Sequence, residues 1–303
     1  MESAACRGPP SVRKTAHGPR IAPYKPLLQR NRSGSPVVLI TGGSKGIGAA
    51  CVRAFQTAGW RVSSVGLPGD HADTTAFRTV VSILGDITDK RVRELAVERT
   101  LIAYGRIDVL INNAAIGLYA SPSTTPQELF MRLIDVNVCA PLALAQLVLP
   151  AMRKQASSTI VNVGSVAGTV ALPWAAAYSA SKAALHAIHD SLRRELHATS
   201  VHLMKVAPGI VDTDFRARVL AGEPPRAVRA IRRTVSPDTV AAAILQGIRK
   251  RRKTVYVPKI GALFALIGNI APGVMDHYLA NLIAGEASTS SVFETHLRSE
   301  KVS

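Results

Sequence analysis

Apolar residues follow two alternating patterns from Pro36 onward. Short runs rich in Val and Ile, typical of buried strands, alternate with longer stretches in which apolar residues recur every three or four positions, as in helices. The predicted strands are Val37–Thr41, Arg61–Val65, Val80–Leu84, Val109–Asn112, Thr159–Val163, Val201–Ala207 and Thr254–Val257. The predicted helices are Ile47–Ala58, Asp89–Tyr104, Pro126–Lys154, Ala175–His197 and Pro237–Arg249. This alternation predicts an α/β fold: one doubly wound, Rossmann-type parallel sheet of about seven strands with helices on both faces, in a single domain.

The domain boundaries follow from where this pattern begins and ends. Residues 1–35 are rich in Pro, Arg and Ser and lack hydrophobic periodicity, so we expect a disordered basic extension. A mitochondrial transit peptide is the alternative for this segment, which is Arg-rich and poor in acidic residues. Residues 36–258 form the predicted domain. Residues 259–303 form an apolar C-terminal extension that either covers the substrate pocket or makes a peripheral membrane or subunit contact.

The net charge of +17 is concentrated in two segments of the chain. Residues 1–36 carry +6 and residues 216–253 carry +9. Neither segment interleaves aromatic with basic residues, so we expect no dedicated nucleic-acid binding.

The cysteines and the apolar runs bear on the compartment. Cys6, Cys51 and Cys139 are widely spaced without any CxxC pair, which predicts neither a disulfide framework nor a metal site. No apolar run reaches the length of a membrane span, and the N-terminus lacks the apolar block of a secretory signal. We therefore expect a cytoplasmic protein, with a mitochondrial location as the alternative.

A glycine-rich turn links the first predicted strand to the first predicted helix. Val37–Ile40 runs directly into Thr41-Gly42-Gly43-Ser44-Lys45-Gly46-Ile47-Gly48. A strand that feeds such a turn at a helix N-terminus points backbone N–H groups and the positive end of the helix dipole at a pyrophosphate. The sequence therefore predicts a dinucleotide cradle.

These glycines resemble the TGxxxGxG motif of the short-chain dehydrogenase/reductase family, and further motifs in the same order agree. Asn112-Asn113-Ala114-Ala115 resembles the family's NNAG with Ala in the last place, and Pro208-Gly209 resembles its PG after the sixth strand. Asp86 resembles the family's adenine-contacting acid, and Thr213 lies where the family has a hydroxyl near the pyrophosphate and nicotinamide amide. The cofactor-binding residues that this resemblance implies are Thr41, Gly42, Ser44, Lys45, Gly46, Ile47, Gly48, Asp86, Ile87, Asn113, Ala114, Ala115, Tyr178, Lys182, Pro208, Gly209 and Thr213.

Charge near the adenosine ribose decides between NAD and NADP. Lys45 resembles the basic residue of NADP-preferring members, and the second strand ends Val65-Gly66-Leu67 without an acid. We expect NADP to be preferred, with NAD possible, since Asp70 could bend back to the ribose and Lys45 could be a solvated loop lysine.

A Tyr/Lys pair supplies the candidate chemistry. Tyr178 and Lys182 lie one turn apart on a predicted helix. The ammonium of Lys182 and a nearby nicotinamide charge should together lower the pKa of Tyr178 toward the working pH. Ser165 precedes Tyr178 by 13 residues, at the carboxyl end of a strand. The family resemblance implies that Ser165 holds the substrate oxygen, that Tyr178 is the general acid and base, and that Asn137 holds a water linking Lys182 to solvent. It also implies that Lys182 binds the nicotinamide ribose.

The basic segment Phe215–Thr234 lies where the family has its mobile substrate lid. Its arginines are either a solvated helix face or a lid that selects an acidic or thioester substrate, and we favour the solvated face.

The sequence predicts an NAD(P)(H)-dependent oxidoreductase that interconverts a carbonyl and a secondary alcohol on a small apolar substrate. A catalytically silent dinucleotide-binding regulator or scaffold is the alternative. We expect a homodimer or homotetramer.

Overall fold

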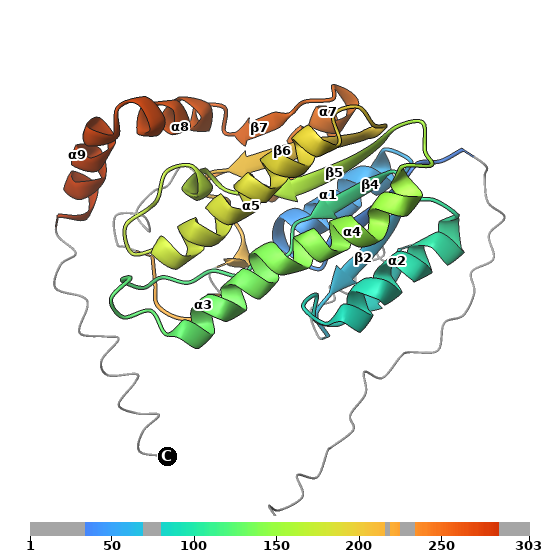
Figure 1. Ribbon diagram of the computed structural model, residues 1–303, viewed down its shortest axis with the longest axis horizontal. Helices are drawn as coiled ribbons and strands as arrows, with labels where there is room; N and C mark the ends of the chain where they lie inside the picture. The colour runs from blue at the N-terminus through green and yellow to red at the C-terminus, as the bar shows by residue number, and fades with distance from the viewer. Residues whose placement is uncertain (1–33, 69–79, 216–218, 225–233, 285–303) are drawn as a thin grey trace, which may run out of the picture. The chain divides into compact units, whose positions relative to one another are not determined.

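The computed structural model describes residues 34–68, 80–215, 219–224 and 234–284 (Figure 1). The predicted disordered extension over residues 1–35 lies almost wholly outside the described residues, as does the end of the apolar extension from residue 285.

Seven parallel strands form one sheet in the order β3-β2-β1-β4-β5-β6-β7. Their bounds are β1 Val37–Thr41, β2 Arg61–Gly66, β3 Val81–Leu84, β4 Val109–Asn112, β5 Ser158–Val163, β6 Val201–Pro208 and β7 Thr254–Val257. Each predicted strand is present, within one residue at either end. The chain winds outward from β1 in one direction and then from β4 in the other, so the crevice between their carboxyl ends is the expected ligand position.

Helices cover both faces of this sheet (Figure 1). Their bounds are α1 Gly46–Thr57, α2 Lys90–Tyr104, α3 Gln127–Ile134, α4 Ala140–Met152, α5 Ala176–Glu195, α7 Pro237–Arg249, α8 Gly261–Ile270 and α9 Pro272–Ile283. Strand alternation divides the core between the faces: Leu39 packs with α2 and α4, whereas Val38 and Ile40 pack with α1 and α7. The doubly wound, Rossmann-type single domain is confirmed.

The predicted helix Pro126–Lys154 is interrupted. A π-helical turn, η2, spans Asp135–Cys139 between α3 and α4. Helical periodicity alone does not reveal such a turn, because α3 and α4 on either side of it are regular α-helices. Asn137 lies inside η2.

The run from Gln127 to Met152 is also long and apolar enough, by length and composition, to cross a membrane. It has 26 residues, and its most apolar 18-residue window has a mean hydropathy of 1.7. The expectation that no apolar run reaches this length is therefore wrong. Half of its apolar window is buried, and Leu144 and Val148 lie in the core against the sheet, so we interpret it as a core helix.

The beginning of the apolar C-terminal extension forms α8 and α9, which the sequence analysis did not assign as helices. Met275 and Leu279 of α9 are buried against Val170, together with Phe264 and Ile267 of α8. This places both helices against the segment that follows Ser165.

Candidate active site

The glycine-rich turn presents the N-terminus of α1 at the carboxyl edge of β1. Gly42 and Gly46 have φ of 65° and 54°, in the left-handed region that favours glycine. A Cβ on Gly48 would lie 2.0 Å from the carbonyl oxygen of Gly42, so no side chain fits there. In this fully described stretch, the N-cap residue Lys45 makes no capping hydrogen bond and the first turn holds no acid. The N-cap side chain therefore leaves the N–H donors at the start of α1 uncapped, which fits a pyrophosphate.

Hydrogen bonds tie this turn to the end of β4. The Thr41 hydroxyl accepts from the backbone N–H groups of Asn113 and Ala114, each at 3.0 Å. The Asn113 side-chain amide donates to the carbonyls of Thr41 at 2.9 Å and Gly42 at 3.2 Å. The glycine turn and the predicted cofactor residues Asn113 and Ala114 are thus held as one unit across the β1–β4 crevice.

The turn after β6 reaches the same place through Thr213. A Cβ on Gly46 would lie 3.1 Å from Cγ2 of Thr213, so the two residues are in close contact. Pro208 ends β6, and the Gly209 N–H donates to the carbonyl of Val257 at 2.8 Å, which anchors this turn on β7. The structure therefore brings Thr213 to the glycine turn, while Pro208 and Gly209 support it from the neighbouring strands.

The side of the turn nearest β2 carries the residues predicted to meet the ribose. Ser44 is 3% exposed, and its Oγ has no hydrogen-bond partner in the described part of the chain. A Cβ on Gly66 would lie 2.0 Å from this oxygen, so Ser44 points at the end of β2. Lys45 is exposed, and Asp70 lies outside the described residues.

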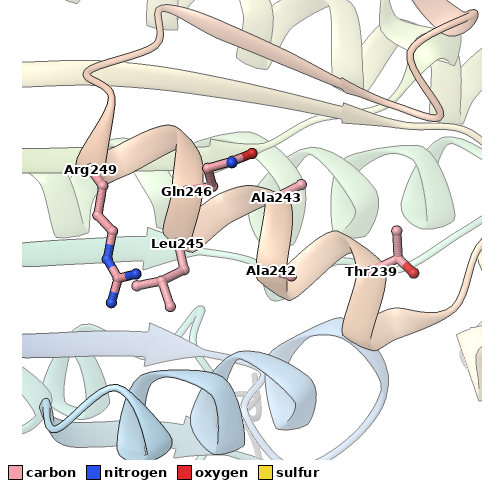
Figure 2. Close-up of a pocket in the computed structure, with 6 residues that line it drawn as sticks. All are labelled: Thr239, Ala242, Ala243, Leu245, Gln246 and Arg249. Atoms are coloured by element: carbon pink, nitrogen blue, oxygen red, sulfur yellow. The ribbon is translucent and has the colours of Figure 1, made fainter.

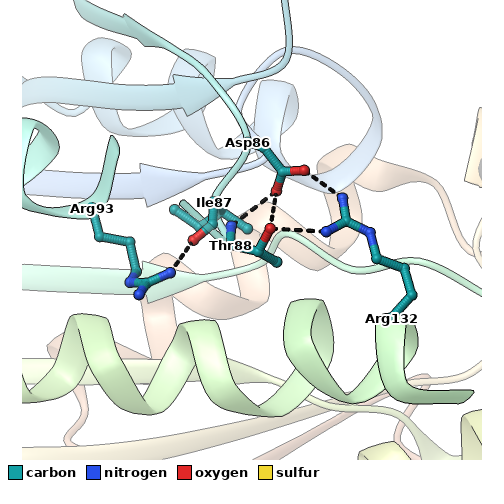
Figure 3. Close-up of polar contacts among 5 residues, drawn as sticks. All are labelled: Asp86, Ile87, Thr88, Arg93 and Arg132. Carbon is teal, nitrogen blue, oxygen red and sulfur yellow. Dashed lines mark hydrogen bonds and ion pairs between the residues drawn. The ribbon is translucent and has the colours of Figure 1, made fainter. Parts of the chain in front are cut away.

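Asp86 and Ile87 lie in the turn after β3. Asp86 Oδ1 accepts from the backbone N–H of Thr88 at 2.9 Å and from its hydroxyl at 2.8 Å. Arg132 of α3 forms an ion pair with Asp86 Oδ2 and donates to the Thr88 hydroxyl at 2.8 Å, as Figure 3 shows. Arg93 of α2 donates to the Ile87 carbonyl at 2.8 Å (Figure 3). The sequence analysis missed both arginines, because neither belongs to a motif.

Ser165, Tyr178 and Lys182 converge at the carboxyl end of β5. Ser165 is the N-cap of η3, a short 3-10 helix over Val166–Gly168, and its hydroxyl accepts from the Ala167 N–H at 3.1 Å. The Ser165 hydroxyl lies close enough to Tyr178 to lower its pKa. Lys182 Nζ lies 5.8 Å from the centre of the Tyr178 ring and donates to the Val163 carbonyl at 3.1 Å. The three predicted residues therefore lie together.

The expected lowering of the Tyr178 pKa is not what the structure shows. Burial raises the pKa of Tyr178 above its ordinary value, and the nearby Tyr119 raises it further, whereas the hydrogen bond with Ser165 lowers it. Burial outweighs the hydrogen bond because a phenolate loses its hydration at this site. Burial also lowers the pKa of Lys182 to about 8.

Asn137 connects three segments through its side-chain amide. Its Nδ2 donates to the Ile116 carbonyl and to the Ser181 hydroxyl, each at 3.0 Å, and its Oδ1 accepts from the Ile116 N–H at 3.0 Å. Ser181 donates in turn to the Tyr178 carbonyl at 2.8 Å. Both hydrogens of the Asn137 side-chain amide are used. A water held by Asn137 would therefore have to donate to its Oδ1 or to its backbone carbonyl oxygen. The water-holding role stays a prediction.

Buried polar side chains of β4, β5 and α5 form a layer that was not predicted from the sequence. Asn112 Nδ2 donates to Asn162 Oδ1 at 2.9 Å, and Asn162 contacts His189 Nδ1 at 3.2 Å. His186 lies under the Ser165 turn, since a Cβ on Gly164 would lie 2.1 Å from its Nε2. Burial is the largest cause that lowers the pKa of His186 to about 3 and of His189 to about 4, so both imidazoles are neutral at pH 7.

Apolar side chains surround Tyr178. The rings of Phe215 and Tyr178 have centroids 5.9 Å apart. The cluster around Tyr178 also contains Ile116, Leu118, Leu129, Phe130, Leu133, Leu220 and Ala221. The arginines of the predicted lid lie outside the described residues: Arg216, Arg218, Arg226, Arg229, Arg232 and Arg233.

Two surface hollows lie away from this group. One follows the outer side of α7 and is lined by Thr239, Ala242, Ala243, Leu245, Gln246 and Arg249 (Figure 2). The other lies at the amino end of the sheet, around Pro36, Trp60 and Asp108. Neither contains a predicted site residue. Within the described ranges, no group of three or more His, Cys, Asp or Glu residues is placed to hold a metal ion.

Comparison with known proteins agrees with this geometry. Residues 36–224 match the family model described as short chain dehydrogenase. The chain is 30% identical over 277 residues to Dehydrogenase/reductase SDR family member 7B of Xenopus tropicalis, which covers 85% of this chain and 89% of that protein. It is 32% identical over 251 residues to a Drosophila melanogaster protein named Dehydrogenase/reductase SDR family protein 7-like. That match covers 78% of this chain and 76% of the Drosophila protein.

Two solved structures share the fold. A short-chain dehydrogenase/reductase from Burkholderia phymatum, in complex with NAD, superposes with a TM-score of 0.71 at 22% identity and covers 80% of this chain and 95% of its own. A short-chain dehydrogenase from Burkholderia cenocepacia, in complex with NADP, gives 0.68 at 24% identity and covers 81% and 97%. The family model and the relatives, together with the fold, show that the chain belongs to the short-chain dehydrogenase/reductase family of oxidoreductases.

Proposed function

We propose that the protein interconverts a carbonyl and a secondary alcohol on an apolar substrate, with NADP(H) as its preferred cofactor and Tyr178 as general acid and base. The observation that carries this proposal is the convergence of Ser165, Tyr178 and Lys182 at the carboxyl end of β5, with Tyr178 packed against an apolar cluster.

The residues at the β1–β4 crevice fit a dinucleotide. The Gly48 position has no room for a Cβ, and the buried hydroxyl of Ser44 has no partner in the described chain. In this proposal the α1 N-terminus would bind the pyrophosphate, and Asn113, Ala114 and Thr213 would lie beside it. Asp86 would accept from the 6-amino group of the adenine.

Tyr178 is protonated at neutral pH, since the ordinary pKa of a tyrosine is about 10 and burial raises it further. It is therefore ready to donate a proton to the substrate oxygen during carbonyl reduction, while the Ser165 hydroxyl holds that oxygen. A bound nicotinamide would supply or accept the hydride. Lys182 uses one ammonium hydrogen on Val163, so two remain for the ribose hydroxyls and the Tyr178 oxygen.

Preference for NADP(H) rests on charge. Lys45 is exposed at the start of α1, and β2 ends at Gly66, with no acid before residue 69 in the described chain. A cation at this position accommodates a 2′-phosphate.

The test is a screen of ketones and secondary alcohols with NADPH and NADH, followed by the absorbance of the reduced nicotinamide. We expect turnover of apolar substrates. Tyr178→Phe should lower turnover by about 10²–10⁴-fold, the range for a positioned acid or base, with the fold and NADPH affinity retained. Near wild-type turnover in Tyr178→Phe would contradict this mechanism. NADPH binding without turnover of any substrate would favour the silent regulator.

A further inference from the structure

The turn that carries Asp86 is clamped by arginines from two helices. Arg132 of α3 contacts both Asp86 and Thr88, and Arg93 of α2 holds the Ile87 carbonyl (Figure 3). The two contacts of Arg132 come from different nitrogens of one guanidinium, so they fix its plane as well as its position.

These contacts leave the Asp86 carboxylate in one orientation. Oδ1 accepts both Thr88 donors, and Oδ2 accepts from Arg132. Burial raises the pKa of Asp86, but hydrogen bonds from Thr88 and Arg132 outweigh it and hold that pKa below its ordinary value. Asp86 is therefore an ionised acceptor, and an ionised carboxylate cannot donate.

This turn is linked to the glycine turn. The Gly85 N–H donates to the Gly66 carbonyl at 2.9 Å, and Ser44 points at Gly66. Asp86 therefore lies just after β3, which pairs with β2. The predicted ribose position is at the end of β2, so the base of a bound dinucleotide would lie near Asp86.

A fixed carboxylate distinguishes purines by the group on carbon 6. Adenine carries an amino donor there, whereas hypoxanthine carries an oxygen that can only accept and would face the carboxylate with like polarity. A carboxylate that could rotate away would discriminate less, because it could avoid the unfavourable contact.

We propose that Arg132 is a positioning residue that makes this site selective for a 6-aminopurine dinucleotide, by holding the Asp86 carboxylate in place. The inference rests on the proposed function, in that a dinucleotide binds with its base at this turn.

The test is fluorescence titration of the full-length protein with NADPH and with its reduced hypoxanthine analogue. Hydrogen bonds to charged groups contribute about 1.5–3 kcal/mol, so the wild type should favour NADPH by about 10–100-fold. Arg132→Met should reduce this ratio to about threefold or less, mainly by weakening NADPH binding. Arg132→Lys, which keeps the charge without the planar fork, should give an intermediate ratio. Asp86→Asn should abolish the preference.

Arg153→Met is the matched control, because it removes an exposed arginine at the end of α4, in the same helical run, and should leave the ratio unchanged. Thermal melting checks that each variant folds. An unchanged ratio in Arg132→Met, or equal weakening of both ligands, overturns the positioning role while leaving the proposed function intact. Failure of the wild type to bind either ligand overturns both.

Discussion

The cofactor side and the substrate side of this site are built from different interactions. Around the glycine turn, the side chains of Thr41 and Asn113 make four hydrogen bonds, to backbone groups of Thr41, Gly42, Asn113 and Ala114. On the other side, the segment after Ser165 meets α8 and α9 through aliphatic contacts at Val170, Met275 and Leu279. Leu263, Leu266 and Ile270 of α8 are more than half exposed.

The difference shows how one fold combines a constant ligand with a variable one. Hydrogen bonds have direction, so the polar side imposes one geometry on a ligand whose phosphates and ribose never change. Apolar packing is roughly proportional to area and has no direction, so many side chains can line the substrate side. Four predictions test this contrast.

The largest effect should be the loss of folding stability at low pH, caused by the buried histidines His186 and His189. His186 and His189 have folded pKa values of about 3 and 4, below the unfolded value of 6.5. The unfolded chain therefore binds more protons between pH 6.5 and pH 4, and the free energy of unfolding falls as pH falls through this window. By pH 4 each imidazole should cost roughly 2–3 kcal/mol.

Urea unfolding between pH 7 and pH 4 measures this slope. A variant with both His186→Gln and His189→Gln should show a shallower slope, whatever its absolute stability. Asp86 and Asp190 have lowered pKa values and lose their contribution only below this window, so they do not mask the result. An unchanged slope would mean that these imidazoles are not responsible.

Leu279→Ala should separate the two sides. Its side chain is 8% exposed against Val170, and a buried Leu→Ala change costs about 2–4 kcal/mol. We expect a raised KM for an apolar substrate and an unchanged Kd for NADPH. Tyr278→Ala, on the same helix but 56% exposed, is the control and should change stability by less than about 1 kcal/mol. Weakened NADPH binding in Leu279→Ala would show that the sides are not separate.

Gly48→Ala should disturb the cofactor side and leave the substrate side unchanged. Its new Cβ would meet the Gly42 carbonyl oxygen, and forcing an extra methyl group into a packed site costs about 1–3 kcal/mol. We expect NADPH to bind about 10–100-fold more weakly. Gly273→Ala adds the same methyl group where no atom lies within 4 Å and should bind NADPH normally. Equal affinities in the two variants would argue against the cradle.

Lys45→Ala should have the smallest effect. Exposed charge pairs contribute about 0.5–1 kcal/mol, so the Kd for NADPH should rise about two- to fivefold while the Kd for NADH stays constant. Lys250→Ala, at the other end of the fold after α7, controls for the loss of one positive charge. Tighter binding of NADH than NADPH by the wild type would refute the predicted preference.

The sequence predicted the polar side better than the apolar side, for the same physical reason. The glycine turn, Asn113 and the Tyr178/Lys182 pair need particular residue types at particular spacings, so the chain displays them. Contacts such as Val170 with Leu279 can be made by any aliphatic pair, and α8 and α9 were expected only as an apolar tail.

Other features depend on tertiary burial. The pKa of Tyr178 was predicted to fall from its neighbour's charge, but its environment decides the sign. Arg132 is one of many arginines in the sequence, and only the fold places it at Asp86.

The π-helical turn η2 has a consequence for insertions and deletions. Removing one residue from Asp135–Cys139 would restore regular helix and rotate everything before it by about 100° relative to α4. Such a deletion would turn Arg132 away from Asp86 and change the direction of the Asn137 amide, while α4 kept its apolar side on the sheet. The length of η2 therefore sets the orientation of both the adenine end and the catalytic end. An insertion or deletion in η2 should disturb both ends at once, even if the residue removed is the exposed Cys139.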